Sequence, residues 1–468
     1  MLFSSIPFLY YFLPVFFILY FLIPSKARNI VLLVMSLVFY FYKEGGYVLL
    51  LLLSSVLGFL FGILVDKYRN NSKKSKTVLT ISIIFNLLIL GFFKYSDFFI
   101  LNLNTVLGTS IPPIHIHLPL GISFYTFQTI GYIVDVYKGE AEPLKNPFNF
   151  ATYVTMFPQL VAGPIVRYTT VKDEIGNRKL SADNFAAGAT RFVIGLGKKV
   201  LIADTLSELN SISSATGNKS VLFYWIIIIS FMLQIYFDFS GYSDMAIGLG
   251  CILGFNFLEN FNYPFISGSV SEFWQRWHIS MGSWFREYIY IPLGGNRVNK
   301  LKWIRNIAVV WFVTGLWHGA SWNYILWGVY FGVILVVEKL LLSKILDKTP
   351  AIIRCLYTLI IVTFSFVIFR LENIKELFEY LKGMLGLLYI PAINRESMYY
   401  LKSYAVVLLV AVIGATPLFK NLILKIKEQP WANKVINILT PIFNVALLLL
   451  VTAFLVDSSF NPFLYFRF

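Results

Sequence analysis

Long apolar runs alternate with short polar or basic segments along almost the whole chain. An apolar helix needs about 20 residues to cross the hydrocarbon core of a membrane. Runs of that scale predict membrane-spanning helices at residues 6–23, 28–43, 46–66, 76–93, 182–205, 220–255, 303–338, 350–371, 401–419 and 432–456. The pattern therefore predicts an all-α, polytopic integral membrane protein.

Two of these runs, 220–255 and 303–338, are too long for one upright helix. Each is expected to be strongly tilted, bent or broken, with Gly241 and Gly315 as the expected break points. Counting such breaks, we expect about 10 to 12 spans. The first run, 6–23, has no small-residue cleavage site, so we interpret it as a spanning helix rather than a signal peptide.

Three stretches are too polar for ordinary spans, at residues 112–150, 259–300 and 372–395. Half-polar segments of a membrane protein usually line a cavity or lie at the membrane surface. We therefore expect re-entrant or interfacial helices in these places. No internal repeat of the length found in transporters is evident.

Composition supports a membrane-embedded body. Apolar residues make up 57% of the chain and charged residues 13%, whereas soluble domains carry roughly 25% charged residues. The net charge of +15 comes largely from short clusters between apolar runs, such as the lysines and arginine of 67–76. Such clusters are typical of cytoplasmic loops that face anionic lipid, so we expect no nucleic-acid partner. Their distribution predicts a multi-pass protein of the cell (cytoplasmic) membrane whose N-terminus lies outside the cytoplasm.

Cysteine and histidine are scarce. Cys251 and Cys355 lie far apart inside apolar runs, which disfavours a disulfide framework, and the chain has only four histidines. A zinc site needs at least three ligands close together. We therefore expect no bound metal and no bound cofactor.

His278 lies in the most unusual segment, Ser271 to Ser280, where a carboxylate, a guanidinium and an imidazole stand among tryptophans. Helical spacing would place Trp274 and His278 on one face. An interfacial helix anchored by tryptophan and Arg276 would explain most of the segment. It does not require the histidine, so a structural and a functional interpretation both remain open.

His318 follows one apolar run and precedes another, which indicates that it lies at membrane depth. Ionisable residues there usually face a cavity or a proton path. A neutral histidine bonded to a backbone carbonyl is the structural alternative. Gly315 and Gly319 flank it and permit close approach of a ligand or another backbone, which favours function. Histidine suits a general base at neutral pH, and acyl transfer to an alcohol needs such a base.

Asp238 and Asp244 interrupt an apolar segment and are costly to bury as unpaired charges. Arg276 and Arg286 are the expected partners, and a structural ion pair is favoured over direct catalysis. A fourth element, 157–168, contains two prolines and predicts irregular backbone that forms a re-entrant turn or a helix end opening onto the site.

Together these segments resemble the membrane-bound O-acyltransferase (MBOAT) family. The similar stretches are FPQLVAGPIVRY at 157–168, QIYFDFSGYSDMAIGLG at 234–250, EFWQRWHIS at 272–280 and TGLWHGASWN at 314–323. The family pairs a histidine in a Trp-His-Gly setting with a second histidine or asparagine about 40 residues earlier. His318 and His278 match those positions. The WFREYIYIPLGGNR stretch at 284–297 is more similar to the branch that O-acetylates polysaccharides of the alginate type.

This resemblance implies one membrane domain over 1–468, with N-terminal spans in 1–110, a family core at 119–340 and C-terminal spans in 350–468. It implies a central funnel in which a thioester donor, either acetyl-CoA or a carrier-bound acyl group, meets a polysaccharide hydroxyl. His318 would be the base, and His278 would orient or stabilise the thioester carbonyl. An extracytoplasmic acetyltransferase or esterase-like partner is also implied. The remaining expected substrate contacts are Trp317, Trp274, Arg276, Tyr236, Asp238, Tyr242, Asp244 and Asn323.

Three alternatives remain at this point. D-Alanyl transfer to teichoic acid is the function of another bacterial branch of the same family. The intramembrane aspartates and histidines would also suit a proton-coupled transporter. A passive scaffold would make no use of either histidine.

Overall fold

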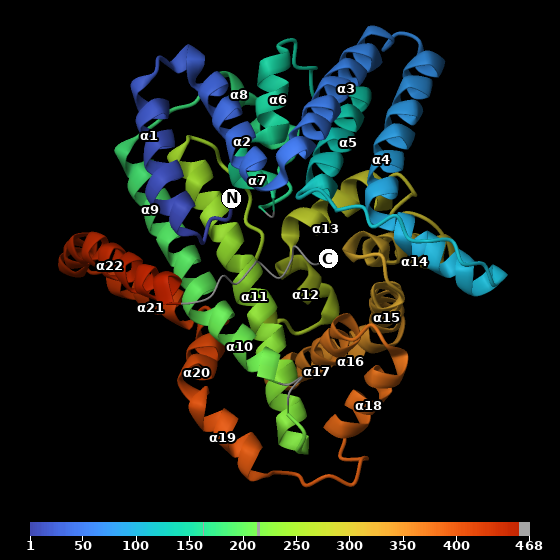
Figure 1. The fold of residues 1–468 in the computed structure, drawn as a ribbon, viewed down its shortest axis with the longest axis vertical. Helices are drawn as coiled ribbons and strands as arrows, with labels where there is room; N and C mark the ends of the chain where they lie inside the picture. Colours follow the sequence, from blue (N-terminus) through green and yellow to red (C-terminus); the bar gives the residue numbers. More distant parts are fainter. Residues whose placement is uncertain (162, 213–215, 458–468) are drawn as a thin grey trace. The chain divides into compact units, whose positions relative to one another are not determined.

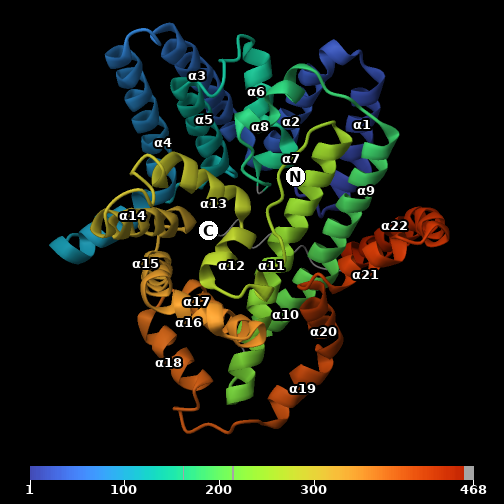
Figure 2. The same cartoon turned by 180° about the vertical axis from the view of Figure 1, so that it is seen from behind.

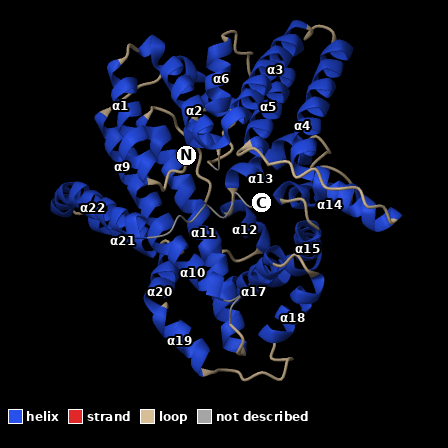
Figure 3. Ribbon diagram, viewed as in Figure 1, coloured by secondary structure: helices blue, strands red, loops and turns tan. Residues whose placement is uncertain are grey.

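The computed structural model describes residues 1–161, 163–212 and 216–457, and every regular element within them is a helix (Figures 1 and 3). Six helical segments are long and apolar enough to cross a membrane, and seven if the pair Arg395–Ser403 and Ala405–Gly414, bent by 59°, is a single span. The six are Ser25–Lys67, Ser72–Leu107, Val221–Ile252, Trp322–Lys348, Ala351–Arg370 and Pro430–Asp457. The chain is thus an all-α polytopic membrane protein.

This number is below the 10 to 12 spans expected from the sequence. One reason is that the expected spans 28–43 and 46–66 are counted together as the single 43-residue segment Ser25–Lys67. Another is that the first apolar helix, Phe8–Leu22, falls short of spanning length.

The described helices form two compact units. The first contains Met1–Phe192 and Ser243–Leu258. In it α3 (Val48–Lys67), α4 (Ser72–Leu107) and α5 (Ile122–Lys138) lie side by side, as Figures 1 and 2 both show. Small residues permit this packing, because a Cβ added at Gly62 of α3 would lie 2.5 Å from the ring of Tyr132 on α5.

The irregular backbone predicted near 157–168 is present in the first unit. A short helix, α7 (Phe157–Leu160), is followed by non-helical residues up to the start of α8 (Tyr168–Gly176), and Ala162 lies outside the described residues. Gln159 is fully buried and donates to the carbonyl oxygen of Tyr153. Backbone of this kind is tolerated in a membrane protein when it is buried in protein, as it is here.

The second unit contains Val193–Tyr242 and the described residues from Glu259 onward. Its centre is a large aromatic cluster to which several helices contribute. These helices are α11 (Val221–Ile252), α12 (Val270–Arg276), α14 (Lys300–His318), α15 (Trp322–Val337) and α17 (Ala351–Arg370). Both histidines of interest belong to this unit.

The predicted break at Gly241 is wrong, because α11 runs without interruption through it. Gly241 instead allows a close helix contact within the second unit. A Cβ there would lie 2.7 Å from the carbonyl oxygen of Gly195 on α9 (Ala182–Gly197). Seven residues further along α11, in the first unit, a Cβ at Gly248 would lie 2.6 Å from the carbonyl oxygen of Gly188. These glycines therefore serve helix packing rather than bending.

The second long run does break, but after His318 rather than at Gly315. Helix α14 ends at His318 and α15 begins at Trp322. Gly315 stays helical, and a Cβ there would lie 2.5 Å from the carbonyl oxygen of Tyr324 on α15. The glycine thus brings the two helices together beside the break.

Replacing Gly241 with valine should destabilise the fold. The new side chain would collide with backbone atoms, which cannot move aside as a flexible side chain can, and overpacking of this kind costs about 1–3 kcal/mol. Thermal unfolding of the purified protein in detergent would show a lower midpoint. Gly91→Val on α4 is the matched control, since nothing lies within 4 Å of a Cβ there. Equal midpoints for both variants would contradict the packing role of Gly241.

Candidate active site

Side-chain oxygens bind the first N–H groups of α12, the short helix that precedes His278. The Ser269 side chain accepts the backbone N–H of Glu272 at the start of α12. The buried carboxylate of Glu338 accepts the N–H groups of Val270 at 2.7 Å and Ser271 at 2.9 Å. A carboxylate is favourable at this end of a helix because the first N–H groups have no partner within it. These bonds fix the start of the helix that leads to His278.

His278 forms the corner between α12 and α13 (Ile279–Phe285). Its φ of 48° and ψ of 52° are left-handed, which costs a non-glycine residue about 1–3 kcal/mol and persists only where the surroundings impose it. The side chain is fully buried, and its ring meets the ring of Phe239 on α11 edge to face at 4.7 Å.

One side of the His278 imidazole is bonded to an asparagine. Its Nδ1 lies 3.1 Å from Oδ1 of Asn260, which also accepts hydrogen bonds from the backbone N–H and the hydroxyl of Ser280. Burial lowers the pKa of His278 to about 3, because the charged imidazolium would lose its hydration. The imidazole is therefore neutral at physiological pH.

His318 is the last residue of α14 and is 6% exposed. Its ring packs edge to face against Trp327 of α15 at 4.7 Å and Phe369 of α17 at 5.5 Å. Gly319 leaves room for this arrangement, since a Cβ there would lie 2.3 Å from the ring of Tyr324. The glycine that follows His318 in the sequence is thus required by close packing at the helix end.

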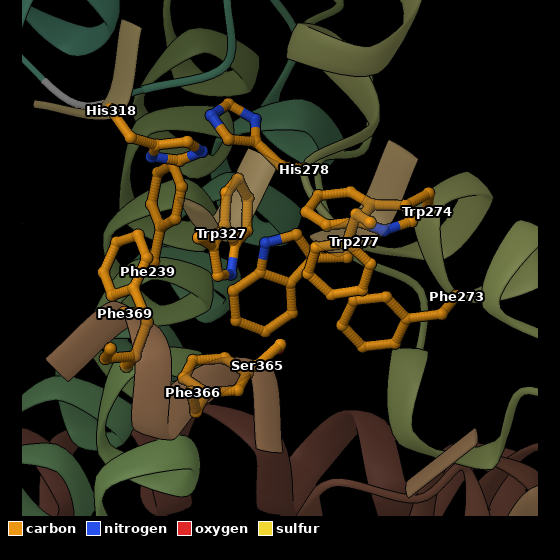
Figure 4. Close-up of a pocket in the computed structure, with 12 residues that line it drawn as sticks. Phe239, Phe273, Trp274, Trp277, His278, His318, Trp327, Ser365, Phe366 and Phe369 are labelled. Atoms are coloured by element: carbon orange, nitrogen blue, oxygen red, sulfur yellow. The ribbon is translucent and has the colours of Figure 1, made fainter. Parts of the chain in front are cut away.

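Both imidazoles line one narrow cavity of about 30 Å³ within the second unit, and Figure 4 shows them at the same side of it. Apart from the two histidines and the hydroxyl of Ser365, its walls are aromatic or aliphatic. The lining residues are Ile235, Phe239, Phe273, Trp274, Trp277, His278, His318, Trp327, Phe331, Ser365, Phe366 and Phe369. Such walls exclude bulk water from two groups capable of proton transfer.

A second, larger cavity of about 460 Å³ adjoins the same wall. Trp274 lines both spaces. The larger cavity is bounded by α12, α13, α14 and the π-helical turn η6 (Arg286–Tyr290), and it carries the polar side chains of Gln275, Ser283 and Arg286.

Several residues expected from the sequence meet at the narrow cavity. Trp274, His278 and His318 line it directly. The ring of Trp317 lies 5.9 Å from that of His278 and 5.0 Å from that of His318, so it touches both imidazoles. Tyr236 is buried in the same aromatic cluster, but it packs against Trp277 and does not reach the cavity.

Asn323, Arg276 and Tyr242 also lie away from the lining. The Asn323 amide donates to the carbonyl oxygen of Phe369 at 3.0 Å and so supports a cavity wall. Arg276 pairs with Glu272 at 2.8 Å, one helical turn earlier. Tyr242 is buried on α11.

The expected partners of the two aspartates were wrong. Asp238 is buried and pairs at 2.9 Å with Lys199, which also binds Asp204 at 2.6 Å. Asp244 belongs to the first unit, where it pairs with Arg191 at 2.9 Å. Both cations come from α9 and its continuation, a helix whose contacts with α11 cannot be seen in the sequence. Structural ion pairing, favoured from the sequence, is what the geometry shows.

Sequence reasoning missed Asn260 and the α17 side of the cavity. Phe366 and Phe369 lie in a run that is apolar throughout, so no signal marks them. Asn260 lies within the polar stretch 259–300, whose character was the only available hint. Among the described residues, no group of three or more His, Cys, Asp or Glu side chains could hold a metal ion.

Comparison with known proteins places this geometry in a family. The model of MBOAT, the membrane-bound O-acyltransferase family, matches residues 38–375. The "Probable alginate O-acetylase" of Azotobacter vinelandii is 37% identical over 499 aligned residues, which cover 100% of both chains. The "Peptidoglycan O-acetyltransferase" of Helicobacter pylori is 34% identical over 423 residues, 83% of this chain and 80% of the relative.

A more distant relative is the "Teichoic acid D-alanyltransferase" of Bacillus subtilis, 30% identical over 273 residues, which cover 55% of this chain and 69% of the relative. The resemblance inferred from four motifs is thus confirmed over most of the sequence. The chain is an O-acyltransferase that belongs to the membrane-bound O-acyltransferase family and, within it, to the alginate-type O-acetylation branch.

Proposed function

We propose that this O-acyltransferase moves an acetyl group from a thioester donor toward hydroxyl groups of a cell-envelope or extracellular polysaccharide. The observation that carries the proposal is the pair of imidazoles, one at the α12–α13 corner and one at the end of α14, that line one mainly apolar cavity. The names of the relatives support the acetyl group and the polysaccharide, since alginate and peptidoglycan are both sugar polymers.

His318 acts as the general base. The acceptor hydroxyl oxygen attacks the thioester carbonyl carbon, a C–O bond forms and the C–S bond breaks. The hydroxyl proton passes to His318 and then to the departing thiolate sulfur, so the reaction neither consumes nor releases a proton overall. Histidine suits both transfers, since its neutral imidazole accepts the proton, its imidazolium donates it, and the two forms interconvert near physiological pH.

The surrounding rings protect the thioester. The rings of Trp327 and Phe369 pack against the ring of His318. The rings of Phe239 and Trp317 pack against the ring of His278. Water in this space would hydrolyse the donor instead of allowing transfer to the acceptor. The larger cavity beyond Trp274, with polar side chains on its wall, suits the more polar part of a substrate.

The donor, acetyl-CoA or a carrier-bound thioester, enters from the cytoplasmic side, and the acceptor approaches from outside. An extracytoplasmic acetyltransferase or esterase-like protein then passes the group to the polymer. This arrangement requires the cytoplasmic membrane, with the N-terminus outside. The basic segment at 67–76 supports the orientation.

D-Alanyl transfer to teichoic acid is the second candidate. The observation in its favour is the 30% identity to the Bacillus subtilis relative. The proton-coupled transporter loses its support, because Asp238 and Asp244 are each bound to a cation.

His318→Ala should lower polysaccharide acetylation in cells by about 10²- to 10⁴-fold, the range that a general base contributes. The readout is the acetyl content of isolated envelope polymers, normalised to the amount of protein in the membrane. His115→Asn is the matched control, because His115 is an exposed histidine whose left-handed backbone asparagine tolerates. Undiminished acetylation by correctly inserted His318→Ala would refute the assignment.

Loss of the protein should remove acetyl esters from a sugar polymer and leave alanyl esters on teichoic acid unchanged. Mass spectrometry of fractionated envelope polymers, with and without the gene, separates the two modifications. Restoring the wild-type chain should restore the acetyl esters. Loss of alanyl esters alone would favour the second candidate.

A further inference from the structure

Asn260 occupies the centre of a small buried network beside His278. Its side chain is fully buried, and its Oδ1 faces three groups: the Ser280 backbone N–H at 3.3 Å, the Ser280 hydroxyl at 2.9 Å and Nδ1 of His278 at 3.1 Å. The Asn260 backbone carbonyl accepts the N–H of Ile279 at 2.9 Å. Both its main chain and its side chain therefore bind the corner that carries His278.

The network determines which ring nitrogen carries the proton. A backbone N–H can only donate, so the Asn260 atom that faces Ser280 must be the oxygen, and the amide cannot be reversed. An oxygen acceptor beside Nδ1 requires a hydrogen on that nitrogen. Since burial keeps the ring neutral, Nε2 carries no hydrogen and presents a lone pair.

The Nε2 atom is buried and has no hydrogen-bond partner among the described residues. Its ring borders the narrow cavity that His318 also lines, and the Trp317 ring contacts both imidazoles. Of the described lining residues, the two histidines are the ionisable ones. Phe239 lines the cavity from α11. The residue before it in the sequence, Asp238, is charged and is paired with Lys199.

We propose that Asn260 is a positioning residue that holds His278 as the Nδ1–H tautomer, so that Nε2 accepts a hydrogen bond from the imidazolium that His318 becomes during acyl transfer. This inference rests on the proposed function. It assigns His278 a role opposite to the carbonyl donor implied by family resemblance, because a nitrogen without hydrogen cannot donate. The hydroxyl proton still passes to His318 and then to the thiolate, and His278 stays neutral throughout.

The left-handed backbone of His278 fits this role. A φ of 48° places the residue at a corner where Asn260 binds the ring on one side and the cavity opens on the other. Unfavourable backbone angles persist where the surrounding structure imposes them, and they gather at functional sites. Simple packing of a buried histidine would not require them.

The tautomer can be measured directly on the wild-type protein. Solid-state NMR of ¹⁵N-histidine-labelled protein in lipid bilayers distinguishes a protonated from an unprotonated ring nitrogen, and the His278→Gln variant identifies the signal. We expect a neutral ring with hydrogen on Nδ1 at neutral pH. Hydrogen on Nε2, or a charged ring, would overturn the proposal whatever the enzyme's activity.

The role toward His318 is tested by the pH–rate profile of thiol release from acetyl-CoA by purified protein, with polysaccharide fragments supplied as the hydroxyl acceptor, across roughly pH 5 to 8, where imidazole titrates. Asn260→Ala should lower the maximal rate by about 10- to 100-fold, the scale on which groups that orient a functional histidine act. It should also move the acidic limb of the pH–rate profile to lower pH. The imidazolium of His318 loses a partner, so His318 stays neutral and active as a base at lower pH. Asn260→Asp should move that limb to higher pH, because a carboxylate strengthens Nε2 as an acceptor.

Asn306→Ala is the matched control. Asn306 is a fully buried asparagine of the same unit that donates to the carbonyl oxygens of Leu293 and Gly295. It should change protein yield without moving the limb. A purely structural Asn260 would behave in the same way, so unshifted limbs in both Asn260 variants would overturn the proposal.

The two measurements separate this inference from the proposed function. Absence of any thiol release by the wild-type protein with acceptor fragments present, together with the Nδ1–H tautomer, would count against the proposed acetyl transfer and leave the tautomer standing. Thiol release with the Nε2–H tautomer would overturn the role of Asn260 and leave acyl transfer standing.

Discussion

A polar side chain inside a membrane protein must find its partner within the chain, because neither hydrocarbon nor bulk water can supply one. Much of this structure follows from that constraint. Lys199 binds two aspartates, Glu338 binds the first N–H groups of α12, and the Arg370 guanidinium donates to Oδ1 of Asn210. The Nε2 atom of His278 is buried without a hydrogen-bond partner among the described residues, and its ring borders the cavity that His318 also lines, which favours a chemical role for it.

The sequence predicted the class of fold and the pair of histidines, since both depend on local information. Apolar run length indicates a membrane protein, and His318 beside Gly319 marks a helix end in an apolar context. It failed for Gly241, because a glycine that bends a helix and a glycine that admits another helix look the same in one sequence. The structure decides between them through Gly195, a residue distant in the chain.

The same limit applies to partners. Arg276 was expected to neutralise an aspartate, yet it pairs with Glu272 on its own helix. The cations that bind the aspartates come from α9 and from η4 (Lys198–Ala203), which continues it, and only the tertiary contacts of this helix with α11 reveal them. Phe366 and Phe369 could not be predicted as lining residues for a similar reason. Their sequence neighbours are all apolar, so the sequence does not show which face of α17 they occupy. Family membership indicates acyl transfer, while the contacts in the structure show which side chains line the cavity.

Trp274 lines both a space of about 30 Å³ at the histidines and one of about 460 Å³. If the acyl group of the proposed reaction occupies the smaller space, a long chain meets packed aromatic rings, that of Trp274 among them. Two carbons demand little rearrangement, whereas each added methylene must displace a side chain from a packed cluster. Under the proposed function, a preference for short acyl chains would follow from core packing around Trp274 rather than from the two histidines.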